Sequence, residues 1–178
     1  MRVEYKYRLA FALALVALPA IAHAAPSEGE QLFREGRAAM QAQDYDRACT
    51  KFAESQTKEP APGTALNLGE CEEHRGRLIA AYDAFTTAAA GFTNAEKQKY
   101  AASRAEALDK KIPRLLVHAT SPVAGLKAHV GSTAIKLGSE VRMDPGDIVV
   151  VAEAPGYQPK ELRVAQSVHL SQRKGQHA

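Results

Sequence analysis

The feature that most constrains this 178-residue chain is an internal repeat of small and aromatic residues. Three pairs of matching residues stand 33 positions apart: Gly36 and Gly69, Ala48 and Ala81, Phe52 and Phe85. Glycine and alanine let two helices approach closely, and a period of about 20 to 50 residues is typical of stacked helical units. The sequence therefore predicts consecutive helix pairs built on one packing plan.

The first 24 residues have the features of an export signal. A basic start that includes Arg2 and Lys6 precedes the apolar run Leu9 to Leu18, and Ala22-His23-Ala24 is a small-x-small cleavage motif. The apolar run is shorter than the roughly 20 residues of a membrane-spanning helix. We therefore expect cleavage after Ala24, a periplasmic or secreted product, and no transmembrane segment after cleavage.

The charge balance argues against a nucleic-acid partner. The whole chain has 23 Lys and Arg against 20 Asp and Glu, and the signal takes away three basic residues and one acidic residue. The remaining 20 basic and 19 acidic residues give a net charge of +1, which offers no excess of positive charge to hold polyphosphate.

Residues 25–112 are predicted to form a helical domain, because apolar residues recur there at three- and four-residue steps. The expected helices run from about Glu28 to Gln41, from Tyr45 to about Lys58, between the breaks at 59–63 and 76–77, from Leu78 to Phe92, and from the capping box at 93–96 to near Lys111. Ser27 to Glu30 and Thr93 to Glu96 fit capping boxes at two of the helix starts. The fifth helix carries many charged residues and is predicted to close the stack as a cap.

The periodicity changes from helical to alternating after Pro113, which predicts a second domain over 113–170. Strand candidates lie at 115–119, 127–130, 148–152 and 162–164, and they are rich in valine and separated by proline and glycine. Gly131-Ser132 and Asp144 to Asp147 are predicted hairpin turns. The predicted fold class is α+β, with helices followed by a small antiparallel sheet or sandwich. The polar tail 171–178 is predicted to be disordered.

The first half resembles the tetratricopeptide repeat over about Gly29 to Phe92. In repeat one, the small residues of that family fall on Gly36 and Ala48, and its turn falls on Asp44-Tyr45. The aromatic residue of its second helix falls on Phe52, and its closing proline on Pro60. Repeat two places them on Leu68-Gly69, Gly76, Ala81 and Phe85. The resemblance implies two antiparallel helical hairpins and a partner-binding concave face.

The second half resembles the PEGA type of surface β-domain over roughly Leu115 to Leu170. The matching positions, in order, are Ser121-Pro122, Ala124-Gly125, Gly131, Pro145-Gly146 and Pro155-Gly156-Tyr157. Exported repeats joined to such a domain resemble envelope proteins of Gram-negative bacteria.

The resemblance to the repeat family also implies a candidate binding face, because stacked repeats curve and line their inner side with the first helix of each repeat. By repeat position this face would carry Phe33, Arg37, Met40, Gln41, Leu66, Asn67, Glu70, Glu73 and His74. Asn67 stands where peptide-binding members often hold a ligand backbone. A simpler interpretation assigns Phe33, Met40 and Leu66 to the core.

Two cysteines allow one disulfide, and export favours it. Cys49 lies on the second helix of repeat one and Cys71 on the first helix of repeat two, and consecutive helices of this kind pack together. We therefore predict a Cys49–Cys71 bond, with two packed thiols as the alternative. Such a bond would stabilise the fold by roughly 3 kcal/mol in the chain-entropy model.

The sequence holds no motif of an enzyme: a nucleophile elbow, HExxH, a phosphate-binding glycine loop and a paired acid motif are all missing. Cys71 and His74, three residues apart beside Glu70 and Glu73, have a spacing that could hold a metal. A packed or bridged Cys71 is the preferred interpretation. No catalysis, no cofactor and no metal are therefore expected.

These observations together predict an exported, non-enzymatic interaction or scaffold protein of the cell envelope. Its helical face would bind a peptide or partner segment. The alternative is an envelope carbohydrate or peptidoglycan binder that uses the β-domain, in which Tyr157 is the one aromatic residue.

Overall fold

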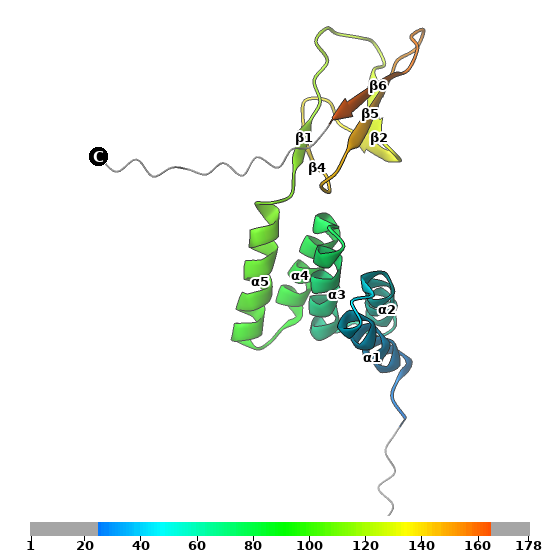
Figure 1. Ribbon diagram of the computed structural model, residues 1–178. Helices are drawn as coiled ribbons and strands as arrows, with labels where there is room; N and C mark the ends of the chain where they lie inside the picture. The colour runs from blue at the N-terminus through cyan, green and yellow to red at the C-terminus, as the bar shows by residue number, and fades with distance from the viewer. Residues whose placement is uncertain (1–24, 165–178) are drawn as a thin grey trace, which may run out of the picture.

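Residues 25–164 are described by the computed structural model, and they contain five helices followed by short antiparallel strands (Figure 1). The chain is therefore α+β with the helices first, as the change of periodicity at Pro113 predicts. The expected signal at 1–24 and the expected tail at 171–178 lie outside the described residues. None of the helices in the described part is long and apolar enough to cross a membrane.

The helices begin and end close to the positions that their periodicity and breaks indicate. They are α1 (Glu28–Gln41), α2 (Tyr45–Lys58), α3 (Pro62–His74), α4 (Leu78–Gly91) and α5 (Ala95–Asp109). Ser27 caps α1, since its hydroxyl oxygen accepts from the Glu30 amide at 3.1 Å. At α5 the cap is Asn94, one residue later than the predicted Thr93, and its side chain accepts from the Lys97 amide at 3.0 Å.

The 33-residue spacing of the sequence corresponds to a repeated contact between helices. In the α1 and α2 pair, Gly36 lies against the ring of Phe52, and in the α3 and α4 pair Gly69 lies against the ring of Phe85. Both phenylalanines are completely buried. The spacing that is repeated within the chain thus places one aromatic ring over one glycine in each helix pair.

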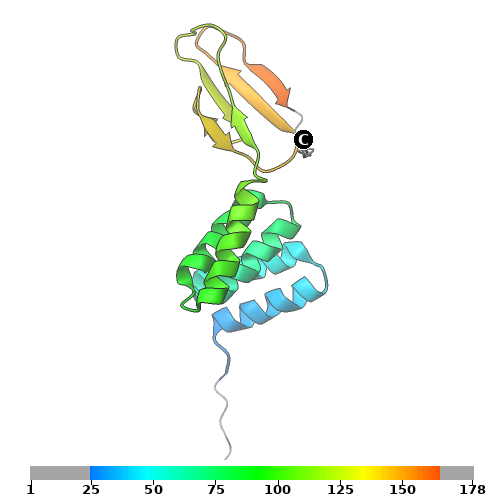
Figure 2. The same ribbon diagram turned by 90° about the vertical axis from the view of Figure 1, so that its left-hand side faces the viewer.

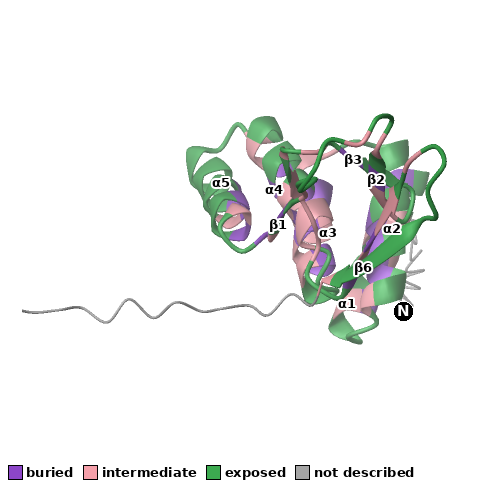
Figure 3. Ribbon diagram, turned by 90° about the horizontal axis from the view of Figure 1, so that it is seen from above, coloured by how far each residue is buried: buried purple, intermediate pink, exposed green. Residues whose placement is uncertain are grey.

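The fifth helix covers the outer side of α4. Its Ala101, Ala105 and Leu108 are buried, and Ala105 and Leu108 join the core of Ala81 and Phe85. The remaining surface of α5 is largely exposed, which is visible as a helix that is buried on one side only (Figure 3). This arrangement agrees with the expectation of a helix that closes the stack.

In the part of the chain that the structure describes, six strands form two small sheets. They are β1 (Arg114–Leu116), β2 (Lys127–Val130), β3 (Thr133–Ile135), β4 (Glu140–Arg142), β5 (Ile148–Glu153) and β6 (Lys160–Val164). Antiparallel pairing gives a four-stranded sheet in the order β3-β2-β5-β6 and a two-stranded sheet of β1 and β4. Both sheets contribute to one apolar cluster that includes Leu115, Ala128, Ile148 and Val150.

The predicted hairpin turn at Gly131-Ser132 joins β2 to β3, where Val130 pairs with Thr133. The predicted hairpin at Asp144 to Asp147 is wrong, because it connects β4 and β5, which belong to different sheets. A physical reason is visible in its first residue. The Asp144 carboxylate accepts a hydrogen bond from the Ile79 amide at 2.8 Å, so this segment turns toward the helices.

The strands lie beyond the start of α4 and the end of α5 (Figures 1 and 2). Asp109, at the end of α5, forms an ion pair with Arg142 of β4 and accepts from Arg114 at 3.3 Å. The Arg142 guanidinium lies 4.5 Å from the centre of the Tyr82 ring of α4. Charged and aromatic contacts therefore join the helical part to the strands.

Candidate functional site

The candidate site is a polar cleft between α3 and α5. It encloses about 440 Å³ and is lined by Glu70, Glu73 and His74 of α3 together with Arg104 of α5. Three of these four residues belong to the binding face that the sequence predicts. Their spacing of three and four residues places them on one side of α3.

An ion pair between the Arg104 guanidinium and the Glu73 carboxylate crosses the cleft. Arg104 also donates to the Tyr100 hydroxyl at 3.0 Å, and its guanidinium lies 5.0 Å from the centre of the Phe85 ring. Burial lowers the pKa of Arg104, but its hydrogen bonds to Glu73 and Tyr100 together raise it by more, so the net pKa is raised. The side chain is thus a fixed cation at neutral pH.

Glu70 is the more available of the two carboxylates. Within the described part of the chain its one side-chain hydrogen bond comes from the Tyr100 hydroxyl at 3.4 Å, which is long and therefore weak. Glu73, in contrast, is neutralised by Arg104. The cleft therefore offers one available acidic group beside a fixed ion pair, an arrangement that can accept hydrogen bonds from a partner.

His74 continues the site toward the start of α2. Its ring stacks on that of Tyr45, with centroids 4.5 Å apart and an interplanar angle of 6°. A neighbouring hollow of about 460 Å³ is lined by both rings and by polar residues that include Asp46, Arg75 and Arg77. The stacked pair provides an aromatic surface between two polar hollows.

The predicted residues of α1 lie away from this cleft. Phe33 and Met40 are half-buried and pack against the core around Phe52, with the Phe33 and Phe52 ring centroids 5.7 Å apart. Arg37 and Gln41 are exposed. The structure thus brings together Glu70, Glu73 and His74 and leaves the α1 residues in a separate region.

The two remaining predicted residues of α3 differ in environment. Leu66 is half-buried and packs against apolar residues of α4 that include Ala81 and Ala88. Asn67 is half-buried, and its side-chain amide donates to the Gly63 carbonyl at 2.7 Å. Its amide oxygen has no hydrogen-bond partner among residues 25–164, so it can accept from a ligand.

Sequence reasoning missed Tyr45, Tyr100 and Arg104 as members of the site. The sequence places Tyr45 at the turn of repeat one, and the other two lie on the helix that is predicted to be a cap. A signal for Arg104 exists in its spacing, since the apolar Ala101 and Leu108, three and four positions away on the same side of the helix, are buried. Glu72, which is also nearby, is buried and paired with Arg75 and Arg77, so it contributes to packing.

Cys49 and Cys71 lie at disulfide-bonding distance, as predicted, with their Cα atoms 5.5 Å apart. Both residues are buried between α2 and α3. Bonding removes the Cys71 thiolate as a ligand, which excludes a metal site that uses Cys71 beside His74. Among residues 25–164 no group of three or more His, Cys, Asp or Glu side chains is arranged to hold a metal ion.

Comparison with known proteins identifies no family model, no curated protein and no solved structure that matches this chain.

Proposed function

We propose that this chain is an exported, non-enzymatic interaction protein of the cell envelope that holds a segment of a protein partner on the face of α3. The helix pairs would be units of the tetratricopeptide type, and the strands a PEGA-like sandwich. The carrying observation is the face of α3, which presents the cleft at Glu70, the His74 ring stacked on Tyr45, and the open amide oxygen of Asn67.

The chemistry of this face suits an extended peptide. Asn67 and Glu70 would accept hydrogen bonds from backbone and side-chain donors, while the stacked rings would pack against apolar or cationic side chains. Arg37, on α1, would contact the same segment if it continued across the helices. The disulfide at the α2 and α3 contact would keep the face preorganised, which limits the entropy lost on binding.

The test is capture of the partner in its native compartment. A photo-reactive amino acid at position 70 should trap a discrete protein in cells that produce the chain, and the same group at Arg47, exposed on α2, should not. Arg37→Ala and Asn67→Ala should then weaken binding of that protein without lowering the melting temperature, with Arg47→Ala as the matched control. Equal trapping from positions 70 and 47, or unchanged affinity in both variants, would remove this face from the account.

The exposure of Tyr157 favours the second candidate, a carbohydrate or peptidoglycan binder. Tyr157 lies in the turn between β5 and β6 and is 69% exposed, so its ring is available to stack on a sugar. Sedimentation with purified peptidoglycan distinguishes the two functions. Sedimentation that Tyr157→Ala abolishes would support this candidate, whereas a protein that stays in the supernatant would exclude it.

A further inference from the structure

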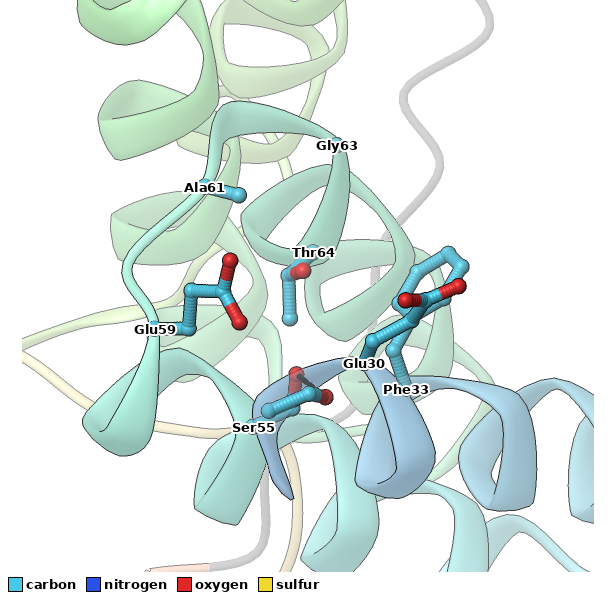
Figure 4. Close-up of a pocket in the computed structure, with 8 residues that line it drawn as sticks. Glu30, Phe33, Ser55, Glu59, Ala61, Gly63 and Thr64 are labelled. Atoms are coloured by element: carbon cyan, nitrogen blue, oxygen red, sulfur yellow. Dashed lines mark hydrogen bonds between the residues drawn. The ribbon is translucent and has the colours of Figure 1, made fainter. Parts of the chain in front are cut away.

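A second pocket lies at the opposite end of α3, where α1 and α3 begin and α2 ends. It encloses about 330 Å³ and is lined by backbone of α1 and α3 and by the side chains of Glu30, Phe33, Ser55, Glu59 and Thr64 (Figure 4). The cleft at Glu70 lies toward the other end of the same helix. This pocket is therefore separate from the candidate site, although Phe33 was predicted as a binding residue.

Thr64 is the unexplained polar group in this pocket. The residue is only 5% exposed, and its hydroxyl has no hydrogen-bond partner among residues 25–164. Figure 4 shows its side chain between that of Glu59 and those of Glu30 and Phe33. A buried hydroxyl without a hydrogen-bond partner destabilises the folded chain, so a ligand that bonds to it would recover that loss.

Ser55 shows what a satisfied hydroxyl looks like in the same pocket. It is also buried, and its Oγ donates to the Gly29 carbonyl at 2.8 Å. Because Ser55 already has a partner inside the protein, Thr64 is the hydroxyl left for a ligand.

The charged lining of the pocket has one sign. Among the described residues, Glu30 and Glu59 are the only charged side chains that line it, and Figure 4 shows one carboxylate on each side of Thr64. Glu59 is held in place by the Ser27 hydroxyl, which donates to its Oε2 at 2.5 Å, and this bond leaves its charge uncompensated. Glu30 pairs with Arg34, but both of these side chains are exposed, which makes the pair weak.

From these observations we infer that this pocket binds the side chain of a lysine carried by the partner segment. The alkyl chain lies against the side chains of Phe33 and Ala61, and the ammonium donates to the Glu59 carboxylate, the Thr64 hydroxyl and the Glu30 carboxylate. The three donors of an ammonium group match these three acceptors. An anion is disfavoured by both carboxylates, and an arginine, whose five N–H donors outnumber these three acceptors, would leave donors without a partner.

The inference rests on the proposed function, because the partner supplies the lysine, but the two can fail separately. Nα-acetyl-lysine N-methylamide, which keeps a free side-chain ammonium, probes the pocket without any partner. The variants at Arg37 and Asn67 test the other face without this probe. N-acetyl-norleucine methylamide is the matched control ligand, since it keeps the alkyl chain and lacks the ammonium.

The experiment is an NMR titration of the full exported chain at low salt. The lysine probe should shift the backbone amide signals of Gly63 and Thr64 in a saturable way, and the norleucine probe should not. Glu59→Gln and Thr64→Val should each weaken lysine binding at least fivefold. Glu106→Gln, an exposed carboxylate on α5, should leave it unchanged.

Equal shifts from norleucine, or no saturable shift from lysine, would overturn the inference. Tighter binding of 1,5-diaminopentane than of the lysine probe would assign the pocket to a free diamine and would also overturn it. If Glu59→Gln unfolds the chain, Thr64→Val decides the question, because valine keeps the shape of threonine and removes only the hydroxyl.

Discussion

A Cβ atom added to Gly36 would lie 2.7 Å from the ring of Phe52, which is closer than real Cβ contacts allow. The ring is completely buried, so it has no open space into which it could turn. The equivalent distance from Gly69 to the Phe85 ring is 2.9 Å. In both helix pairs the missing side chain of a glycine is the space that an aromatic ring fills.

Gly36→Ala and Gly69→Ala should therefore lower the free energy of unfolding. Overpacking a core contact costs about 1 to 3 kcal/mol, and contacts below 3.0 Å should fall in the upper part of that range, about 2 to 3 kcal/mol. Alanine gains roughly 1 kcal/mol over glycine inside a helix, so we expect a net loss of about 1 to 2 kcal/mol for each variant, measured by urea denaturation.

Gly63→Ala is the matched control for these two variants. Gly63 also lies in a helix, but no atom stands within 4 Å of the Cβ position there. This variant should leave the stability unchanged or raise it by up to about 1 kcal/mol. A loss at Gly63 as large as that at Gly36 would show that the close contact is not the cause.

The helices could be predicted from the sequence because their signals are local. Apolar residues at three- and four-residue steps and clear breaks such as Pro60 to Gly63 fix helix position within a residue or two. β3 and β4 were missed because each has three residues, too few to show alternation; β1 is equally short, but its apolar residues continue to Val117 and mark it. The pairing of β4 with β1 is also long-range, and no local pattern records it.

The candidate site was predictable only where one helix carries it. Glu70, Glu73 and His74 share a side of α3, so their spacing alone grouped them. Arg104 joins them across 31 positions of sequence, and the contact depends on how α5 packs against α4. Thr64 illustrates the same limit, because its burial and lack of a partner follow from tertiary packing.

The disulfide should provide a large part of the stability of the helices. The 22-residue separation of Cys49 and Cys71 corresponds to roughly 3 kcal/mol in the chain-entropy model. Reductant should therefore lower the melting temperature of the native chain, and Cys49→Ala with Cys71→Ala should start from the lower value and not respond to reductant. Two alkylatable thiols in unreduced, exported protein would contradict this prediction.

The contact between Asp144 and α4 should be worth about 1 kcal/mol. α4 has no side-chain cap of its own at Arg77, and the Asp144 carboxylate accepts from the Ile79 amide instead. Replacing a capping aspartate by alanine costs about 0.5 to 2 kcal/mol. Asp144→Ala should show this loss in thermal denaturation, and Asp144→Asn should retain much of the stability because its amide oxygen also accepts.

Asp147→Ala tests whether the turn or the cap is responsible. Asp147 is exposed in the same turn, and its carboxylate accepts no hydrogen bond from any of the described residues. Its replacement should change the stability by less than about 0.5 kcal/mol. Similar losses at both positions would mean that the aspartates act on the turn itself.

The final prediction concerns Asp109, which holds two arginines at the junction between helices and strands. Arg142 also lies 4.5 Å from the Tyr82 ring centre, whereas Arg114 has the Asp109 contacts alone among its side-chain interactions with residues 25–164. All three charged side chains are about one-third exposed or more, so solvent screens both pairs.

We expect a double-mutant cycle of Asp109→Asn with Arg142→Met to give a coupling energy of roughly 0.5 to 1 kcal/mol, and the cycle with Arg114→Met to give less. Lysine at position 142 should not restore the coupling, because it lacks the planar group that fits between a carboxylate and a ring. Both coupling energies should fall as salt is raised. Equal coupling in the two cycles would show that the Tyr82 ring does nothing to fix Arg142.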